Sequence, residues 1–255
     1  MTACSPRMGG SRRGIEEASG ARLAVDPVVG GVEPLASIAL WPWVLLASQH
    51  ELSVGQLAEG LGVPVAQLRD PGARFSQDVG NRLAEMVYER AGPGAAMHAA
   101  VMVEAGHFAL FELLARTSPT VGEALVLACQ YFPLLHRDVR LVHEVRADEV
   151  QVMRVTLPEY PTHHGYVELA FAAWVLALRR ETRDEGFAPA AAWFGHQVPA
   201  GARAAFEAVL GPHVRFGMPE AQLQFSPEAS ALRLARENAD VHAEALRAAA
   251  DLIRS

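Results

Sequence analysis

The sequence has 255 residues, of which 51% are hydrophobic and 20% are charged, and this composition is typical of a globular protein. The formal net charge of −7 disfavours a nucleic-acid-binding surface as the dominant feature, because phosphate neutralisation requires clustered positive charge. The longest apolar stretch, residues 167–178, is about half a membrane span, and no signal-peptide core follows the N-terminus. We therefore expect a cytoplasmic protein that has no membrane partner.

The first 34 residues are rich in Gly, Ser, Arg and Pro and show no sustained periodicity. This composition predicts a disordered leader over residues 1–34. Order is expected to begin with an apolar helical run over residues 35–47, interrupted by Pro42.

Several short helices are predicted next. Ser53 can cap one that ends at residue 59, Pro64 can open another, and Ser76 can cap a third that ends before residue 92. Residues 95–116 are again helical in pattern, with a break around Gly106.

The clearest start signal in the chain is Thr120 followed by Glu123, which have the spacing of a capping box. The helix that begins there is expected to end near Pro133, since proline cannot continue a helix. A helix is therefore predicted directly before the pattern changes to strands.

Alternating apolar and polar residues over 139–145 and 150–157 predict a hairpin with a turn at residues 147–148. The apolar phase slips by one position between Val152 and Met153. We therefore expect either a bulge or a strand that is buried on both faces.

The remaining pattern favours a long helix after Pro161 that ends in arginines. It is followed by a strand at 191–196, a helix at 200–210, strands at 213–216 and 222–225, and a helix from 232 to the end. Together these elements predict an α+β fold: a helix-rich single domain with a small, mostly antiparallel sheet.

Residues 57–68 resemble a helix-turn-helix, with a glycine turn between two short helices. From Glu51 to Asp70 the only basic residue is Arg69, set against three acidic residues. A DNA-reading role for this segment is therefore disfavoured.

Ten histidines raise the question of a metal site, but the sequence contains no CxxC, no HExxH and no His-x-x-x-His pair. The adjacent His163 and His164 are expected to point in different directions, with one exposed and one packed. No nucleophile elbow and no phosphate-binding loop are present. We therefore expect no metal, no cofactor, no catalytic residues and no enzymatic activity.

A set of aromatic and polar residues from helices and from both flanks of the hairpin could converge on one apolar pocket for a ligand. Ordinary core packing is the alternative interpretation of the same residues. The candidate pocket residues are Phe108, Phe111, Tyr131, Phe132, His136, Tyr160, Tyr166 and Trp174.

Several fragments in order resemble the arabinose-binding-type N-terminal domain of AraC-family transcription regulators. They lie at residues 61–68, 70–75, 82–83, 117–125 with Tyr131, 194–199, 214–217 and 223–225. The usual Pro-Leu near the final helix is absent around residues 231–234.

The resemblance implies an effector-sensing domain over residues 35–235 and a C-terminal helix over 236–255 that leads to a helix-turn-helix DNA-binding domain not present in this chain. The implied partners are an unidentified small molecule and DNA reached only through that second domain. The stripe from Ala239 to Ile253 could pack on its own domain or form a homodimer. The alternative is a stand-alone small-molecule-binding or protein-interaction module without DNA binding.

Overall fold

The computed structural model describes residues 33–254, so the predicted leader lies almost entirely outside the described residues. The helices are α1 (Ser37–Gln49), α2 (Val54–Leu61), α3 (Val65–Arg69), α4 (Gln77–Ala91), α5 (Ala95–Val101), α6 (Ala109–Arg116), α7 (Val121–Tyr131), the 3₁₀ turn η1 (Phe132–Leu134), α8 (Gly165–Thr182), α9 (Arg203–Leu210), α10 (Pro227–Ala231) and α11 (Ala239–Arg254). The strands are β1 (Leu35–Ala36), β2 (Arg74–Phe75), β3 (Arg140–Val145), β4 (Gln151–Thr156), β5 (Ala191–Trp193), β6 (Val214–Arg215) and β7 (Gln222–Phe225).

The main sheet has five strands in the order β3-β4-β7-β5-β6, and β1 pairs separately with β2. Every pairing is antiparallel except that of β5 with β6. The prediction of an α+β fold with a small, mostly antiparallel sheet is confirmed.

The hairpin of β3 and β4 has an unbroken register, with His143 opposite Met153 and Glu144 opposite Val152. Val152 and Met153 are both buried, at 1% and 3% exposure. Of the two alternatives for the phase slip, the strand buried on both faces is therefore correct, and no bulge occurs.

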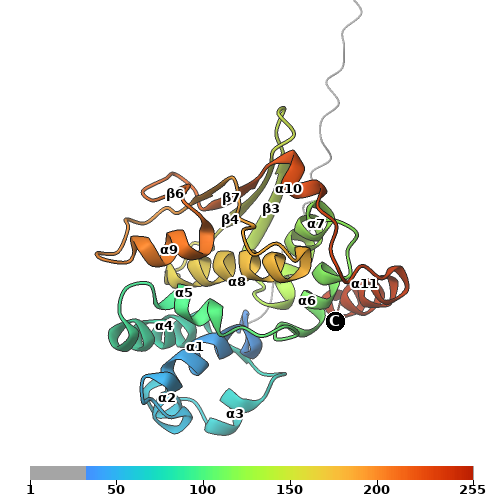
Figure 1. The fold of residues 1–255 in the computed structure, drawn as a ribbon. Helices are drawn as coiled ribbons and strands as arrows, with labels where there is room; N and C mark the ends of the chain where they lie inside the picture. Colours follow the sequence, from blue (N-terminus) through green and yellow to red (C-terminus); the bar gives the residue numbers. More distant parts are fainter. Residues whose placement is uncertain (1–32, 255) are drawn as a thin grey trace, which may run out of the picture.

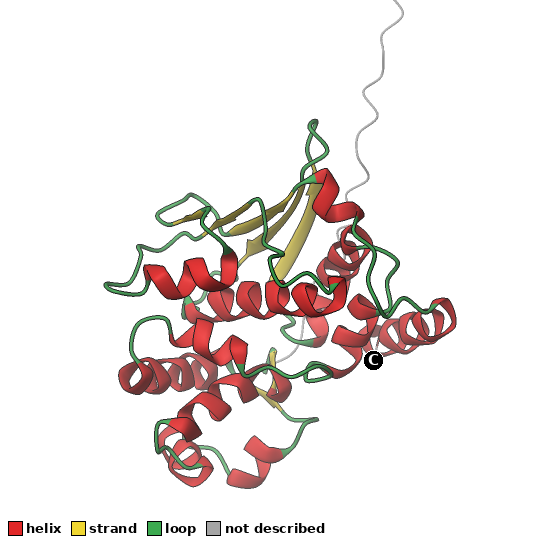
Figure 2. Cartoon of the chain, viewed as in Figure 1, coloured by secondary structure: helices red, strands yellow, loops and turns green. Residues whose placement is uncertain are grey.

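The helices form layers beneath the sheet (Figures 1 and 2). α8 runs directly under the sheet, α5 and α6 lie below it, and α1 and α4 follow, with α2 and α3 at the far end. α11 lies to one side, next to α6. The apolar core continues through these layers from Trp43 on α1 to Phe225 on β7.

Three predicted N-caps, at Ser53, Ser76 and Thr120, are present in the structure. Ser53 Oγ accepts a hydrogen bond from the Gln56 amide, and the Gln56 side chain accepts one from the Ser53 amide. Ser76 caps α4 in the same way, and Thr120 Oγ1 accepts from the Glu123 amide at 3.3 Å. Each cap satisfies a backbone donor that the first helical turn leaves free.

Pro42 does not interrupt α1, although the sequence predicted a break in the helix at this proline. A proline inside a helix leaves the carbonyl four residues earlier without its intrahelical donor, and here that carbonyl belongs to Ile38. The ring Nε2 of His107 donates to this oxygen at 3.1 Å. A side chain distant in sequence therefore replaces the lost helical hydrogen bond.

The prediction of one helix from residue 232 to the end is wrong. α10 ends at Ala231, residues 232–238 run without regular structure, and α11 begins at Ala239. Asn238 Oδ1 accepts from the Val241 amide at 3.0 Å, which caps α11, while Leu234 is buried at 4% exposure. Burial of Leu234, together with the hydrogen bond from its amide to the Pro119 carbonyl at 3.2 Å, holds the connecting segment against the domain.

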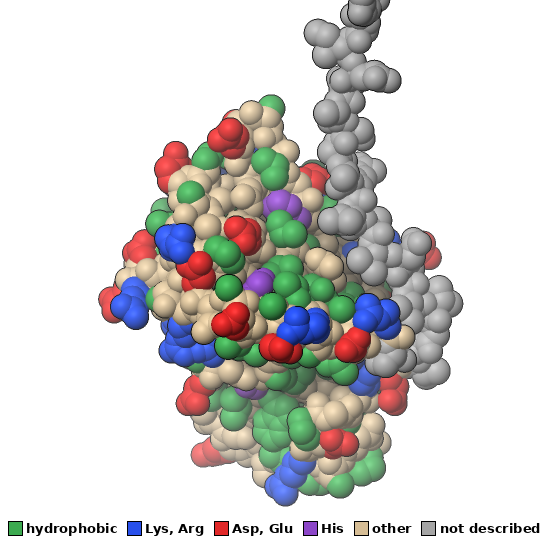
Figure 3. All heavy atoms as spheres, turned by 90° about the vertical axis from the view of Figure 1, so that its right-hand side faces the viewer, with side chains coloured by type: hydrophobic (Ala, Val, Ile, Leu, Met, Phe, Trp, Pro, Cys, Tyr) green, Lys and Arg blue, Asp and Glu red, His purple; other side chains and the backbone are tan. Residues whose placement is uncertain are grey.

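The helix-turn-helix-like segment consists of α2 and the five-residue α3, joined by Gly62 in the left-handed conformation at φ 68°. A helix this short does not extend along a DNA groove. The face shown in Figure 3 has acidic and basic side chains interspersed rather than one extended positive area.

Candidate ligand-binding site

A cavity of about 120 Å³ lies between the sheet and helices α6, α7 and α8. A dry apolar cavity of about 150 Å³ can hold a benzene molecule, so this space has the scale of a compact apolar ligand. The apolar lining includes Phe108, Phe111, Ala128, Phe132, Leu141, Met153, Val155, Trp174, Ala177 and Leu234.

Aromatic rings form one wall of the cavity. The Phe111 ring centroid lies 6.0 Å from that of Phe132 and 6.2 Å from that of Trp174. The indole Nε1 of Trp174 is buried and has no hydrogen-bond partner within residues 33–254. A buried donor left unpaired costs about 1–3 kcal/mol, so an acceptor on a ligand that reached it would gain affinity.

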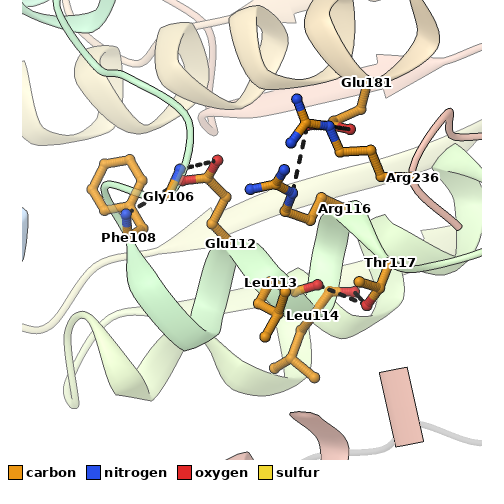
Figure 4. A network of polar contacts seen from close by, with 9 residues as sticks. All are labelled: Gly106, Phe108, Glu112, Leu113, Leu114, Arg116, Thr117, Glu181 and Arg236. Carbon is orange, nitrogen blue, oxygen red and sulfur yellow. Dashed lines mark hydrogen bonds and ion pairs between the residues drawn. The ribbon is translucent and has the colours of Figure 1, made fainter. Parts of the chain in front are cut away.

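Charged side chains of α6 and α8 contribute to the cavity lining, and Figure 4 shows three of them, Glu112, Arg116 and Glu181, near one another. Glu112 on α6 accepts from the Gly106 amide at 2.8 Å and from the Phe108 amide at 3.4 Å. These two bonds fix the loop that enters α6. Because the carboxylate oxygens of Glu112 are already engaged by the backbone, its role in the cavity lining is to hold that loop.

Glu181 on α8 lies beside Arg116 of α6 in the cavity lining, with 3.7 Å between Arg116 Nε and Glu181 Oε1. Burial raises the pKa of the Glu181 carboxyl, and the nearby Arg116 only partly opposes this effect. A carboxylate that burial disfavours depends strongly on its cationic neighbours.

The segment between α10 and α11 attaches to these charged residues. Arg236 Nε lies 3.5 Å from Glu181 Oε2, and the Ala235 amide donates to the Glu181 carbonyl at 2.6 Å. Further along, Thr117 Oγ1 and His242 Nδ1 form a hydrogen bond of 2.9 Å. Residues of α6 and α8 near the cavity therefore contact both the segment before α11 and the first turn of α11 itself.

The cavity lining also contains His136 and Tyr166, whose polar atoms are satisfied internally. His136 Nε2 donates to Gln77 Oε1 at 2.7 Å, and its Nδ1 accepts from the Val139 amide. Burial lowers the pKa of His136 to about 4, so the ring is neutral at pH 7. The Tyr166 hydroxyl donates to the Gly80 carbonyl at 2.7 Å.

Six of the eight candidate pocket residues line the cavity, namely Phe108, Phe111, Phe132, His136, Tyr166 and Trp174. Tyr131 and Tyr160 do not. Tyr131 is buried in the core beyond the cavity wall, and the Tyr160 hydroxyl donates to Asp138 at 2.7 Å. Whether the six contact a ligand stays a prediction.

The sequence analysis missed the charged lining residues Glu112, Arg116, Arg180 and Glu181. Charged residues within apolar helical stretches were the signal that could have identified them. Their pairing across α6 and α8 has no sequence signature, because the two helices are far apart in the chain.

His163 and His164 do not point apart as expected. Their rings stack, with centroids 4.4 Å apart, at the N-terminal end of α8, and both side chains are half-buried rather than one exposed and one packed. Among the described residues, His164, Glu168 and His196 form a group that could hold a metal ion.

No helix within residues 33–254 is long and apolar enough to cross a membrane.

Residues 52–234 match the family described as the arabinose-binding domain of AraC transcription regulators, N-terminal. No curated protein matches the sequence. Among solved structures, the fold is similar to that of the transcriptional regulator CdpR from Pseudomonas aeruginosa, with a TM-score of 0.54 and 13% sequence identity. The similarity covers 79% of this chain and 61% of CdpR, so the chain spans less than two thirds of that regulator.

Proposed function

The chain belongs to the family of arabinose-binding domains of AraC transcription regulators, and from this premise we propose that it binds a compact, largely apolar effector in the cavity between the sheet and α6, α7 and α8. The observation that carries the proposal is the predominantly apolar lining, which four charged side chains of α6 and α8 interrupt. Arabinose itself fits this lining poorly, because a sugar needs a hydrogen-bonding partner for most of its hydroxyl groups.

The proposed domain organisation follows from the same arrangement. Residues 35–235 form the effector-sensing domain, and residues 236–255 form the connection toward a DNA-binding domain. The mixed charge on the face shown in Figure 3 supports DNA contact through a separate domain. A cytoplasmic location is proposed because a transcription regulator acts where the DNA is.

The proposed relay begins at Leu234 and Glu181, which both line the cavity. Leu234 belongs to the segment before α11, and Glu181 contacts Arg236 in that segment. An effector that displaces either side chain changes the free-energy difference between two states of this segment, one docked on the domain and one released from it. The cavity acts in binding rather than catalysis, in keeping with a family of regulator domains.

The test is thermal unfolding of the full chain with indole, toluene and octanoate as probes. A ligand that binds only the folded state raises its stability, by about 2.7 kcal/mol at a concentration of one hundred times Kd. At least one probe is expected to raise Tm. Absence of stabilisation by all three contradicts an apolar effector site.

Ala177 offers a variant that separates the cavity from the rest of the surface. Ala177 is half-buried and lines the cavity, so Ala177→Phe fills the space and is expected to abolish the probe-dependent rise in Tm. Val101→Phe is the control, because Val101 is 65% exposed and lies outside this cavity. An equal rise in both variants places the bound probe elsewhere.

A further inference from the structure

A group of potential metal ligands lies at the N-terminal end of α8, outside the lining of the apolar cavity. His164 and Glu168 come from one turn of α8, spaced by four residues, and His196 comes from the loop after β5. Their nearest ligand atoms all lie within 4.8 Å of one another. We propose that these three residues bind a divalent transition-metal ion of the Zn²⁺ type.

The hydrogen bond on the far side of the His196 ring determines which nitrogen can act as a ligand. His196 Nδ1 lies 2.8 Å from the carbonyl oxygen of Gln197, and only an N–H on Nδ1 can donate to a carbonyl. In the neutral ring Nε2 then carries a lone pair. Metal-binding histidines commonly donate their second nitrogen to a carbonyl in this way.

That lone pair faces a carboxylate oxygen. His196 Nε2 lies 3.0 Å from Glu168 Oε1, which is ion-pair distance, and both atoms are buried. The same carboxylate oxygen lies 3.8 Å from His164 Nε2. Two electron-rich atoms 3.0 Å apart repel each other unless a cation lies between them. Either a proton on Nε2 or a metal ion can be that cation, and we infer that a metal ion takes this place because His164 Nε2 approaches the same oxygen.

The separations between Glu168 Oε1 and the two histidine nitrogens are close to those expected around a zinc ion. With Zn–N and Zn–O bonds of about 2.0–2.1 Å, tetrahedral ligand atoms lie about 3.3 Å apart. The two observed separations, 3.0 Å from His196 Nε2 and 3.8 Å from His164 Nε2 to Glu168 Oε1, fall on either side of this value. Two histidines and one glutamate form a known zinc ligand set that leaves the fourth position open.

Neighbouring residues hold the ligands in place. The Tyr88 hydroxyl donates to Glu168 Oε2, which leaves Oε1 as the free oxygen of that carboxylate. The Gly217 amide donates to the His196 carbonyl at 2.8 Å and fixes the loop that presents the ring. Glu168 is fully buried, while the His164 side chain is 41% exposed, so the ion would have access from solvent.

The sequence contained one signal of this site, the His164-x-x-x-Glu168 spacing with an acidic residue at the edge of an apolar stretch. The third ligand, His196, follows 28 residues after Glu168, and this separation belongs to no short zinc-binding motif that a sequence search would recognise. The proposal therefore departs from the expectation that the protein has no metal site.

The test is metal binding by the full chain after treatment with EDTA. Zn²⁺ bound after dialysis is measured by elemental analysis, and Co²⁺ is used as a spectroscopic probe, because four-coordinate Co²⁺ absorbs strongly in the visible range. One equivalent per chain and tetrahedral Co²⁺ bands are expected. His164→Ala and His196→Ala should each raise the metal Kd more than tenfold, and Tyr88→Phe should raise it about 10- to 100-fold.

His98→Ala is the matched control, because His98 is exposed and lies outside the group. Its Kd is expected to be unchanged. If His196→Ala fails to fold, the more exposed His164→Ala carries the test. The proposal is overturned if the chain binds less than one equivalent, or if His164→Ala binds as tightly as His98→Ala. In that case a shared proton alone joins His196 and Glu168.

Discussion

Glu181 and Arg236 form an ion pair in which Arg236 Nε lies 3.5 Å from Glu181 Oε2. Glu181 lines the cavity, whereas Arg236 belongs to the segment that leads into α11. The Arg236 side chain is 59% exposed, so solvent screens the pair and limits its strength. A weak contact between a ligand cavity and a terminal helix suits a regulator, because a modest change in the cavity can break it.

Removing the cation from this contact is predicted to loosen α11 while leaving the domain folded. Arg236→Gln should change the free energy of unfolding by less than about 1 kcal/mol. Amide hydrogen exchange in α11 should nevertheless become faster, because local opening loses one of its opposing contacts. Arg233→Gln is the control, since Arg233 pairs with Glu237 in the same segment. Equal exchange in both variants contradicts a specific role for the Glu181–Arg236 pair.

Removing Arg116 is predicted to be more damaging than removing Arg236. Its side chain is only 17% exposed and faces the buried Glu181 carboxylate. Arg116→Met should lower the free energy of unfolding by about 1–3 kcal/mol in urea denaturation, because a buried charge loses a partner. Adding Glu181→Gln to this variant should restore part of the loss. A double variant less stable than Arg116→Met contradicts this explanation.

The neutral state of His136 predicts a pH dependence of stability. The pKa of His136 is about 4 in the folded chain and near 6.5 when unfolded, because burial disfavours the cation. The unfolded state therefore binds more protons between these values, and this contribution to stability is lost as pH falls from about 6.5 to 4.

His136→Gln removes that titration. At pH 7 the variant should be less stable than the wild type, because Nδ1 no longer accepts from the Asp138 and Val139 amides. The difference should shrink by on the order of 2 kcal/mol between pH 7 and 4.5, measured by denaturation at each pH. A pH-independent difference would mean that His136 titrates equally in both states.

The bond from His107 to the Ile38 carbonyl predicts that α1 depends on a residue outside it. His107→Phe keeps an aromatic ring edge-to-face with Phe108 but removes the donor. The free energy of unfolding should fall by about 1 kcal/mol, because the partly buried Ile38 carbonyl loses its donor. His98→Phe, at an exposed position, should change it by less than about 0.5 kcal/mol. Faster amide exchange confined to the turn around Pro42 would locate the effect.

Local interactions determined most of the secondary structure, and the sequence alone was sufficient to predict them. Ser53, Ser76 and Thr120 cap the helices that follow them because a cap needs only a side chain and an amide three residues away. The hairpin of β3 and β4 likewise follows from short-range alternation and a turn. The family resemblance also rested on such local fragments, and the match over residues 52–234 confirms it.

Contacts between distant residues decided the rest. The donor that lets α1 pass through Pro42 comes from His107, and burial of Leu234 holds against the domain a non-helical segment whose own pattern was helical. The charged part of the cavity lining and the group of His164, Glu168 and His196 likewise arise only when separate elements pack together. A sequence pattern records the helical or strand period of a residue but not the partner that folding places against it, and the chemistry of these sites resides in those partners.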